Sequence, residues 1–195
     1  MNSKFSLLAA AALTAALLQG CAAVVVGAAA TGVAVAHDRR TAGTIVDDES
    51  IEVKAMGALN ADKEIRDQTH LNVTSYNNVV LMTGETPTQQ LGQRAYQIVS
   101  GLDKVKKVHN EVIVAAPSSF GSRSNDVLLT SKVKARMIAT KGFDASLVKV
   151  VSERGIVYLM GLVYRHEGDL ATAITRQTEG VQKVVKLFEY QDTGK

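Results

Sequence analysis

Apolar and polar positions follow two alternating periods along the chain, and the same series occurs twice. Apolar residues at helical spacing predict four helices, over residues 49–60, 88–101, 127–140 and 167–179. Alternation with a period of two predicts six strands, over residues 70–75, 79–84, 108–115, 147–152, 156–163 and 184–190. Each half of the chain therefore has the order α-β-β-α-β.

The two halves also resemble each other in sequence. The stretch "LNVTSYNNVVLMTG" (71–84) aligns without a gap with "VKVVSERGIVYLMG" (148–161). Between the halves, residues 116–125 contain Pro117 and several serines, which is typical of a linker, and Asn125 or Asp126 is the expected N-cap of the next helix. The pattern predicts a duplicated α+β domain, at 47–115 and 126–191, with two helices packed on one face of a three-stranded sheet in each copy.

The alignment places Gly84 opposite Gly161, and both are expected to close the second strand of their domain. A glycine at a strand end usually serves backbone geometry, through a positive φ or a bulge. We therefore interpret both glycines as structural.

The N-terminus has the anatomy of a secretory signal. Lys4 provides a positive start, and an apolar run follows over residues 7–18. The run ends at Leu18-Gln19-Gly20-Cys21, which contains the chain's single cysteine. This motif resembles the lipobox of bacterial lipoproteins, which implies cleavage after residue 20 and covalent acyl and diacylglycerol groups on Cys21. The alternative is an uncleaved membrane-spanning helix from Leu7 toward Ala36.

Residues 21–46 are interpreted as an acylated N-terminus followed by a tether. Residues 22–36 are small and apolar without a clear period, and "HDRRTAGT" is polar and favours turns. Whether the apolar part lies against the bilayer is left open by the residues.

Charge is distributed unevenly between the two halves. Residues 47–115 contain 7 basic and 10 acidic side chains, whereas residues 121–195 contain 12 basic and 8 acidic ones. The basic excess is modest and confined to the second half, so it is weak evidence for a nucleic-acid partner. We expect no nucleic acid and no small-molecule substrate.

Several motifs resemble the BON domain. They are the strands "VVLMTGET" and "IVYLMGLV" and the closing segments "GLDKVKKVHNEV" and "TEGVQKVVKLF". Two such domains behind a lipobox resemble the dual-BON-domain outer-membrane lipoproteins of Gram-negative bacteria. The resemblance implies a non-enzymatic, lipid-anchored protein of the outer membrane that faces the periplasm. It also implies binding of anionic phospholipid such as phosphatidylglycerol, support of membrane integrity, and enrichment at the division site.

In that family the lipid-facing element is the first helix of the second domain, here residues 125–140. At about 100° per residue, Leu129, Val133 and Met137 share the core face of this helix. The predicted phospholipid-binding residues lie elsewhere on the helix and are Val127, Leu128, Ser131, Lys132, Lys134, Ala135, Arg136, Ile138 and Ala139. The apolar ones are expected to enter the headgroup boundary and the three bases to flank them. The alternative is that Val127 and Leu128 pack against the other domain.

The resemblance implies a tryptophan where this chain has Leu128. Leucine keeps an apolar side chain at this position but lacks the preference of an indole for the membrane interface. Leucine at this position changes the expected affinity for phospholipid more than the expected place of the binding surface.

Enzyme chemistry has little support in the sequence. The histidines at 37, 70, 109 and 166 are scattered without metal-ligand spacing, so no metal and no cofactor are expected. The acidic run Asp47-Asp48-Glu49 is interpreted as a complement to a helix dipole. A second interpretation is a scaffold that docks outer-membrane assembly or division-site proteins, with the acidic first domain as the docking surface.

Overall fold

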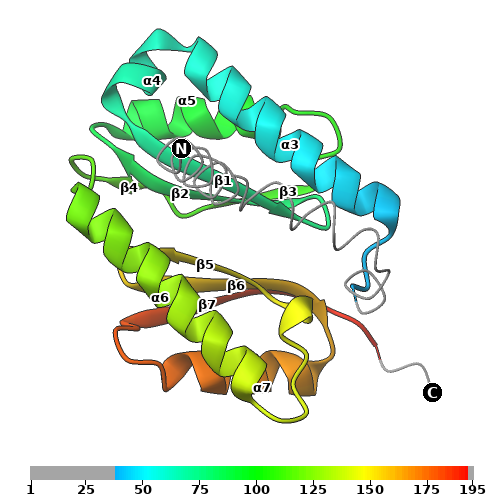
Figure 1. Ribbon diagram of the computed structural model, residues 1–195. Coiled ribbons are helices and arrows are strands. Elements are labelled where there is room, and N and C mark those ends of the chain that lie inside the picture. The colour runs from blue at the N-terminus through cyan, green and yellow to red at the C-terminus, as the bar shows by residue number, and fades with distance from the viewer. Residues whose placement is uncertain (1–37, 193–195) are drawn as a thin grey trace, which may run out of the picture. The chain divides into compact units, whose positions relative to one another are not determined.

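Two α-β-β-α-β units follow each other in the computed structural model, which describes residues 38–192 (Figure 1). The first comprises α3 (Ala42–Ala61), α4 (Lys63–Gln68), β1 (His70–Tyr76), β2 (Val79–Thr86), α5 (Gln89–Ser100), β3 (Lys107–Asn110) and β4 (Ile113–Val114). The second comprises α6 (Phe120–Ala139), the 3₁₀-helix η1 (Ala145–Leu147), β5 (Lys149–Glu153), β6 (Ile156–Val163), α7 (Arg165–Arg176) and β7 (Lys183–Tyr190). The predicted α+β class and the duplicated plan are confirmed.

The two sheets have the same topology. In the first, β2 pairs antiparallel with β1 and parallel with β3 and β4; in the second, β6 pairs antiparallel with β5 and parallel with β7. Each parallel pair is joined by a crossover helix, α5 or α7, as parallel strands require. The single strand predicted over 108–115 is interrupted, but its register against β2 is the same on both sides of the break.

Each sheet is covered on one face by its two helices (Figure 1). Toward the first sheet, α3 buries Asp48, Ile51, Ala55 and Leu59. Toward the second sheet, α6 buries Asp126, Leu129, Val133 and Met137, which have the same spacing along the helix. The helix-facing residues of the central strands, such as Val80 and Leu159, complete the two cores.

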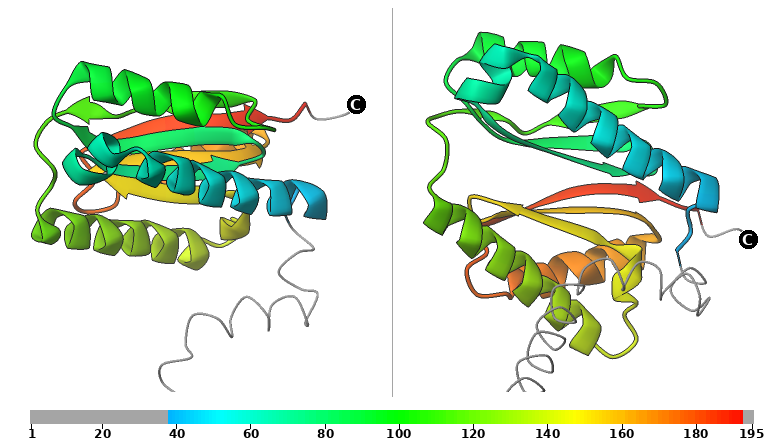
Figure 2. Two further views of the ribbon diagram at one scale, coloured as in Figure 1. Left: turned by 90° about the horizontal axis from the view of Figure 1, so that it is seen from above. Right: turned by 45° about the horizontal axis from the view of Figure 1, so that its top comes forward.

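The other faces of the two sheets form a third core. Tyr76 and Leu81 of the first domain cluster with Tyr158 and Met160 of the second. As a result β2 is buried along its whole length, because its alternate side chains face the helices and the other domain in turn. From Arg39 onward the chain forms one compact unit (Figure 2).

Both long helices begin earlier than their apolar patterns predicted. α3 begins at Ala42 instead of residue 49, with Thr41 as its N-cap. α6 begins at Phe120 instead of residue 127, with Ser119 as its N-cap. The end of the predicted tether and most of the predicted linker are therefore helical, and neither Asn125 nor Asp126 caps a helix. The extra turns have few buried residues, so the apolar period did not reveal them.

Two adjacent arginines attach the segment before α3 to both domains. Arg39 donates to both carboxylate oxygens of Glu167 at 2.6 and 2.8 Å and lies over the ring of Tyr164. Arg40 donates to Asp48 at 2.9 Å and lies over the ring of Tyr76. The residues just before α3 are thus anchored, whereas the sequence predicted them to be part of a tether.

The predicted signal peptide, Cys21 and most of the predicted tether lie outside the described residues. Among the helices within 38–192, none has the length and apolar character needed to cross a membrane.

Candidate functional site

The outward face of α6 is apolar and exposed to solvent. Four large side chains on it keep most of their surface accessible: Phe120 (80%), Val127 (67%), Leu128 (60%) and Ile138 (73%). The core side chains of the same helix are almost fully buried on the other face. A helix that packs on one side only should be polar outside, so this face departs from the ordinary pattern.

The exposure of Val127 and Leu128 bears on the alternative in which they pack against the first domain. Neither side chain is buried against the first domain, so the predicted alternative of interdomain packing is wrong. The smaller residues of the same face, Ser131, Ala135 and Ala139, are exposed as well. The face is therefore available to a partner.

The three predicted bases have different environments. Lys132 and Arg136 are exposed, and Arg136 also donates to the carbonyl of Gln177 at 2.6 Å. Lys134 instead points toward the domain, where its Nζ donates to the carbonyl oxygens of Ala145 and Val148 at 3.0 and 2.8 Å. Burial lowers the pKa of Lys134. The interpretation of Lys134 as a flanking surface base is thus wrong, because its side chain anchors the loop that precedes β5.

Two residues of this face were missed because the helix was expected to begin at residue 127. Phe120 and the exposed base Arg123 both lie on the first turns of α6. One side of a helix contains Phe120, Val127 and Ser131, which are seven and four residues apart. This spacing indicates an earlier helix start, but the serines around it are more typical of a loop.

The corresponding face of α3 has a different chemistry. Ala42, Glu49, Ser50 and Asn60 lie where α6 has its four large apolar residues, counting from the first residue of each helix. α3 does expose two valines, Val46 and Val53. Its acids outnumber its one base, whereas the only acid of α6, Asp126, is buried. The two helices therefore share a core face but not an outer face.

Buried aspartates in these helices hold the β-hairpin turns. Asp48 accepts hydrogen bonds from the backbone N–H groups of Asn77 and Asn78, each at 2.8 Å. Asp126 accepts from the N–H groups of Arg154 and Gly155 at 2.8 and 2.9 Å. Asp48 was expected to complement a helix dipole, but it binds the turn between β1 and β2 instead. A sequence pattern does not reveal this contact, because the helix and the turn lie far apart in the chain.

The two aligned glycines lie inside their strands, two residues before the end, and not at the strand end as predicted. Gly84 has a φ of +115°, and a Cβ there would lie 1.9 Å from the carbonyl oxygen of His70. Gly161 has no positive φ, but a Cβ there would lie 2.5 Å from the carbonyl oxygen of Leu147. The predicted positive φ thus holds for Gly84 alone, while both positions require the absence of a side chain.

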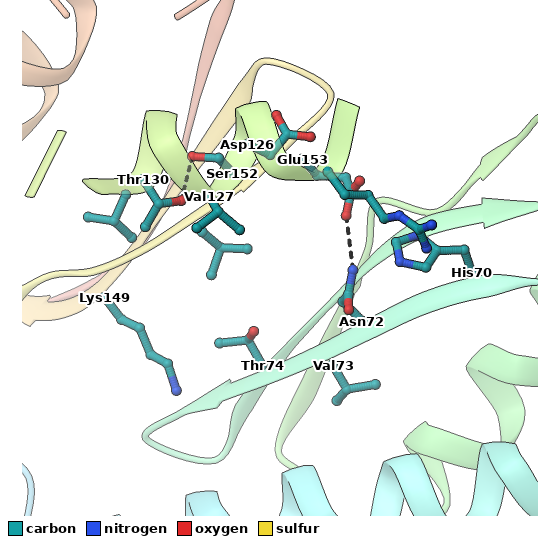
Figure 3. Close-up of a pocket in the computed structure, with 13 residues that line it drawn as sticks. His70, Asn72, Val73, Thr74, Asp126, Val127, Thr130, Lys149, Ser152 and Glu153 are labelled. Atoms are coloured by element: carbon teal, nitrogen blue, oxygen red, sulfur yellow. Dashed lines mark hydrogen bonds between the residues drawn. The ribbon is translucent and has the colours of Figure 1, made fainter. Parts of the chain in front are cut away.

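A cleft of about 470 Å³ lies between β1 and β5, next to α6 (Figure 3). Asn72 donates to Glu153 across it at 3.1 Å, and Lys149 reaches Glu52 at 2.8 Å. Val127 of α6 contributes to its wall. The cleft therefore adjoins the exposed face of α6. It separates the edges of β1 and β5, and the Asn72–Glu153 hydrogen bond crosses it.

The described histidines occupy different settings. His70 lies in β1, with its Nδ1 atom 3.1 Å from Glu85, and is only partly exposed. His109 lies in β3, where burial lowers its pKa. His166 is exposed and stacks on Tyr164, and His37 lies outside the described residues. His70 and His109 thus lie in strands that the apolar alternation predicted, and both are partly buried.

The fold and its internal repeat agree with the family comparison. Residues 47–116 and 125–192 each match the BON domain, so this chain belongs to the BON-domain family. It is 39% identical over 175 residues to the outer membrane lipoprotein DolP of Haemophilus influenzae, covering 90% of this chain and 91% of that protein. It is 33% identical over 153 residues to a 21 kDa hemolysin of Actinobacillus pleuropneumoniae, covering 78% and 79%. Osmotically-inducible protein Y of Escherichia coli is 28% identical over 145 residues, covering 73% and 72%.

Proposed function

We propose that this chain is a non-enzymatic outer-membrane lipoprotein whose second BON domain binds anionic phospholipid through α6. The observation that supports this best is the outer face of α6, with four exposed apolar side chains next to the exposed bases Lys132 and Arg136. The similarity to an outer membrane lipoprotein over nine-tenths of the chain supports the location. Binding of this kind helps to maintain the integrity of the outer membrane.

The physical argument rests on two additive contributions. Insertion of one large apolar side chain at the headgroup boundary is worth about 1.5–3 kcal/mol if its burial is complete. Each Lys or Arg close to an anionic surface adds about 1 kcal/mol. Lys134 is excluded from this second contribution because its ammonium group is bonded to backbone carbonyls.

Liposome flotation tests the proposal. The chain without residues 1–21 is mixed with vesicles that contain or lack phosphatidylglycerol, so that acylation does not contribute. Parent protein should float with the anionic vesicles. Leu128→Glu should reduce its flotation sharply, because the change replaces an inserted apolar group by a charge of the same sign as the lipid.

Val53→Glu provides a matched control, because Val53 is an exposed apolar residue on the corresponding helix of the first domain. It should float as the parent does. If Leu128→Glu remains folded by circular dichroism and still floats, α6 is not the membrane contact.

The anchor is tested separately through Cys21. Cys21→Ala should yield a precursor that incorporates no labelled palmitate and does not fractionate with the outer membrane. Label in that variant would contradict the lipobox interpretation.

A second function, docking of outer-membrane assembly or division-site proteins, is supported by α3. Val46 and Val53 are exposed on this helix, and the exposed Glu49 lies between them. An apolar strip with acidic neighbours is unsuited to an anionic membrane but suits a basic protein surface. Val53→Lys should weaken such docking, because it removes an apolar contact and repels a basic partner, and it should leave lipid binding by α6 unchanged, which separates the two functions.

A further inference from the structure

Three side chains from three different strands converge at the seam between the two BON domains. They are His70 of β1, Glu85 of β2 and Glu153 of β5, and their nearest donor atoms all lie within 4.8 Å of one another. Glu85 is fully buried and Glu153 is 7% exposed. An imidazole and two carboxylates in such proximity form a donor set that suits divalent metal ions.

The two carboxylates have little buried positive charge to balance them. Glu85 lies 3.3 Å from Arg154, whose side chain is half exposed. The side chains that donate to Glu153, Asn72 at 3.1 Å and Thr83 at 3.4 Å, are both neutral. Buried carboxylates are normally paired or bound to metal, so this arrangement favours a bound cation.

The geometry is compatible with a tetrahedral ion. Zinc ligands lie about 2.0–2.2 Å from the metal, so two of them at the tetrahedral angle are about 3.3 Å apart. The separation between His70 Nδ1 and the Glu85 Oε2 atom is 3.1 Å. The donor atom of Glu153 lies within 4.8 Å of the other two, and binding requires it to move closer to them.

The cleft beside α6 provides access to this cluster. His70 and Glu153 line it together, at the end away from Lys149 (Figure 3). A metal site needs a path for the ion and, with three protein ligands, a water molecule at the fourth position. The cleft reaches two of the three ligands, His70 and Glu153, while Glu85 lies buried behind them.

We propose that His70, Glu85 and Glu153 bind one divalent transition-metal ion of the Zn²⁺ type, which joins β1 and β2 of the first domain to β5 of the second. The imidazole nitrogen favours Zn²⁺ over Mg²⁺ or Ca²⁺, which prefer oxygen ligands alone. The ion is a structural link between the domains and is independent of the lipid-binding proposal. It departs from the expectation of no metal, because cross-strand proximity does not follow from spacing along the chain.

Calorimetric titration with ZnCl₂ tests this site. The full chain is purified from membranes in detergent, freed of metal with a chelator and titrated at neutral pH. We expect one strong site per chain and a higher Tm with zinc, because a ligand of the folded state stabilises it. His70→Gln and Glu153→Gln should each weaken zinc binding by about tenfold or more, the loss typical of disturbed metal sites.

His166→Gln is the matched control, because His166 is an exposed histidine outside the cluster, and its zinc binding should equal that of the parent. Circular dichroism identifies folded variants; if Glu153→Gln is not folded, the partly exposed His70 decides the test. The proposal is overturned if zinc does not bind, if His70→Gln binds zinc as His166→Gln does, or if Mg²⁺ binds equally well. A Tm that responds to pH but not to zinc would assign the cluster to a shared proton instead.

Discussion

The helices α3 and α6 occupy the same place in the two domains but face different surroundings. Toward the core they are alike: each buries an aspartate and three apolar residues at the same spacing. Toward solvent they differ, since α6 exposes large apolar residues with bases, while the corresponding positions of α3 are small, polar or acidic. The comparison teaches that the fold constrains one face of this helix, and the outer face is free to specialise.

The largest effects are expected from substitutions at the glycines that both domains require. Gly161→Glu should unfold the second domain, with a loss of at least about 5 kcal/mol, since the new side chain meets the carbonyl of Leu147. Gly84→Glu should be no less damaging in the first domain, because Gly84 also has a positive φ. Urea unfolding followed by circular dichroism measures both. A parent-like midpoint for Gly161→Glu would show that the strand tolerates a side chain.

The buried aspartates offer a graded test of the same kind. Asp126→Ala should cost about 3 kcal/mol, because two turn N–H groups lose their charged acceptor. Asp48→Ala should cost about 4 kcal/mol, since Asp48 also accepts from the Ser75 hydroxyl and the Arg40 guanidinium. Free energies of unfolding from denaturant titrations give both values. Equal losses would show that the extra contacts of Asp48 contribute nothing.

Charge reversal on α6 sharpens the difference between the outer faces. The double variant Lys132→Glu with Arg136→Glu should weaken binding to phosphatidylglycerol vesicles by about 2 kcal/mol or more, and the effect should shrink as salt rises. Lys54→Glu, at the place of Lys132 on α3, should have no effect on vesicle binding. Lys134→Gln should lower stability without changing the salt dependence, because the Lys134 ammonium group is bonded within the domain. A salt response in Lys134→Gln would restore this residue to the lipid-facing surface.

The smallest expected effect concerns the ion pair that joins Arg39, before α3, to Glu167 of the second domain. Hydrogen bonds from Arg39 lower the pKa of Glu167, which is the third residue of α7. The third residue of α5, the corresponding helix of the first domain, is the apolar Leu91, which cannot form such a pair. Glu167→Gln should cost about 1 kcal/mol at pH 7. A carboxyl with a lowered pKa in the folded state contributes above its ordinary pKa of 4.5 and loses that contribution as the pH falls through the lowered value.

Unfolding at neutral and acidic pH measures this ion pair. The stability difference between parent and Glu167→Gln should close as the solution becomes acidic. Asp169→Asn, a change at an exposed carboxylate on the same helix, is the control and should show little difference at any pH. A difference for Glu167→Gln that is constant with pH would exclude a charge effect.

Much of the fold follows from local pattern. The strands and the core faces of the helices were predictable because apolar side chains repeat at the periods of two and 3.6 that a covered sheet and its helices require. The core positions Leu129, Val133 and Met137, predicted from spacing alone, are buried as expected. The helix starts were not predictable in this way, because the first turns of α3 and α6 add few buried residues.

The duplicated α-β-β-α-β plan, the paired glycines and the apolar outer positions of the helix that begins the second domain were all predictable from the residues alone. The tertiary structure decided that Leu128 stays exposed, that Lys134 turns inward, and that Asp48 and Asp126 hold hairpin turns. It also brought His70, Glu85 and Glu153 together from three strands. The physical reason is that periodicity reports which side of an element is buried, whereas these contacts join residues far apart in the chain, and their proximity depends on how sheets and helices pack.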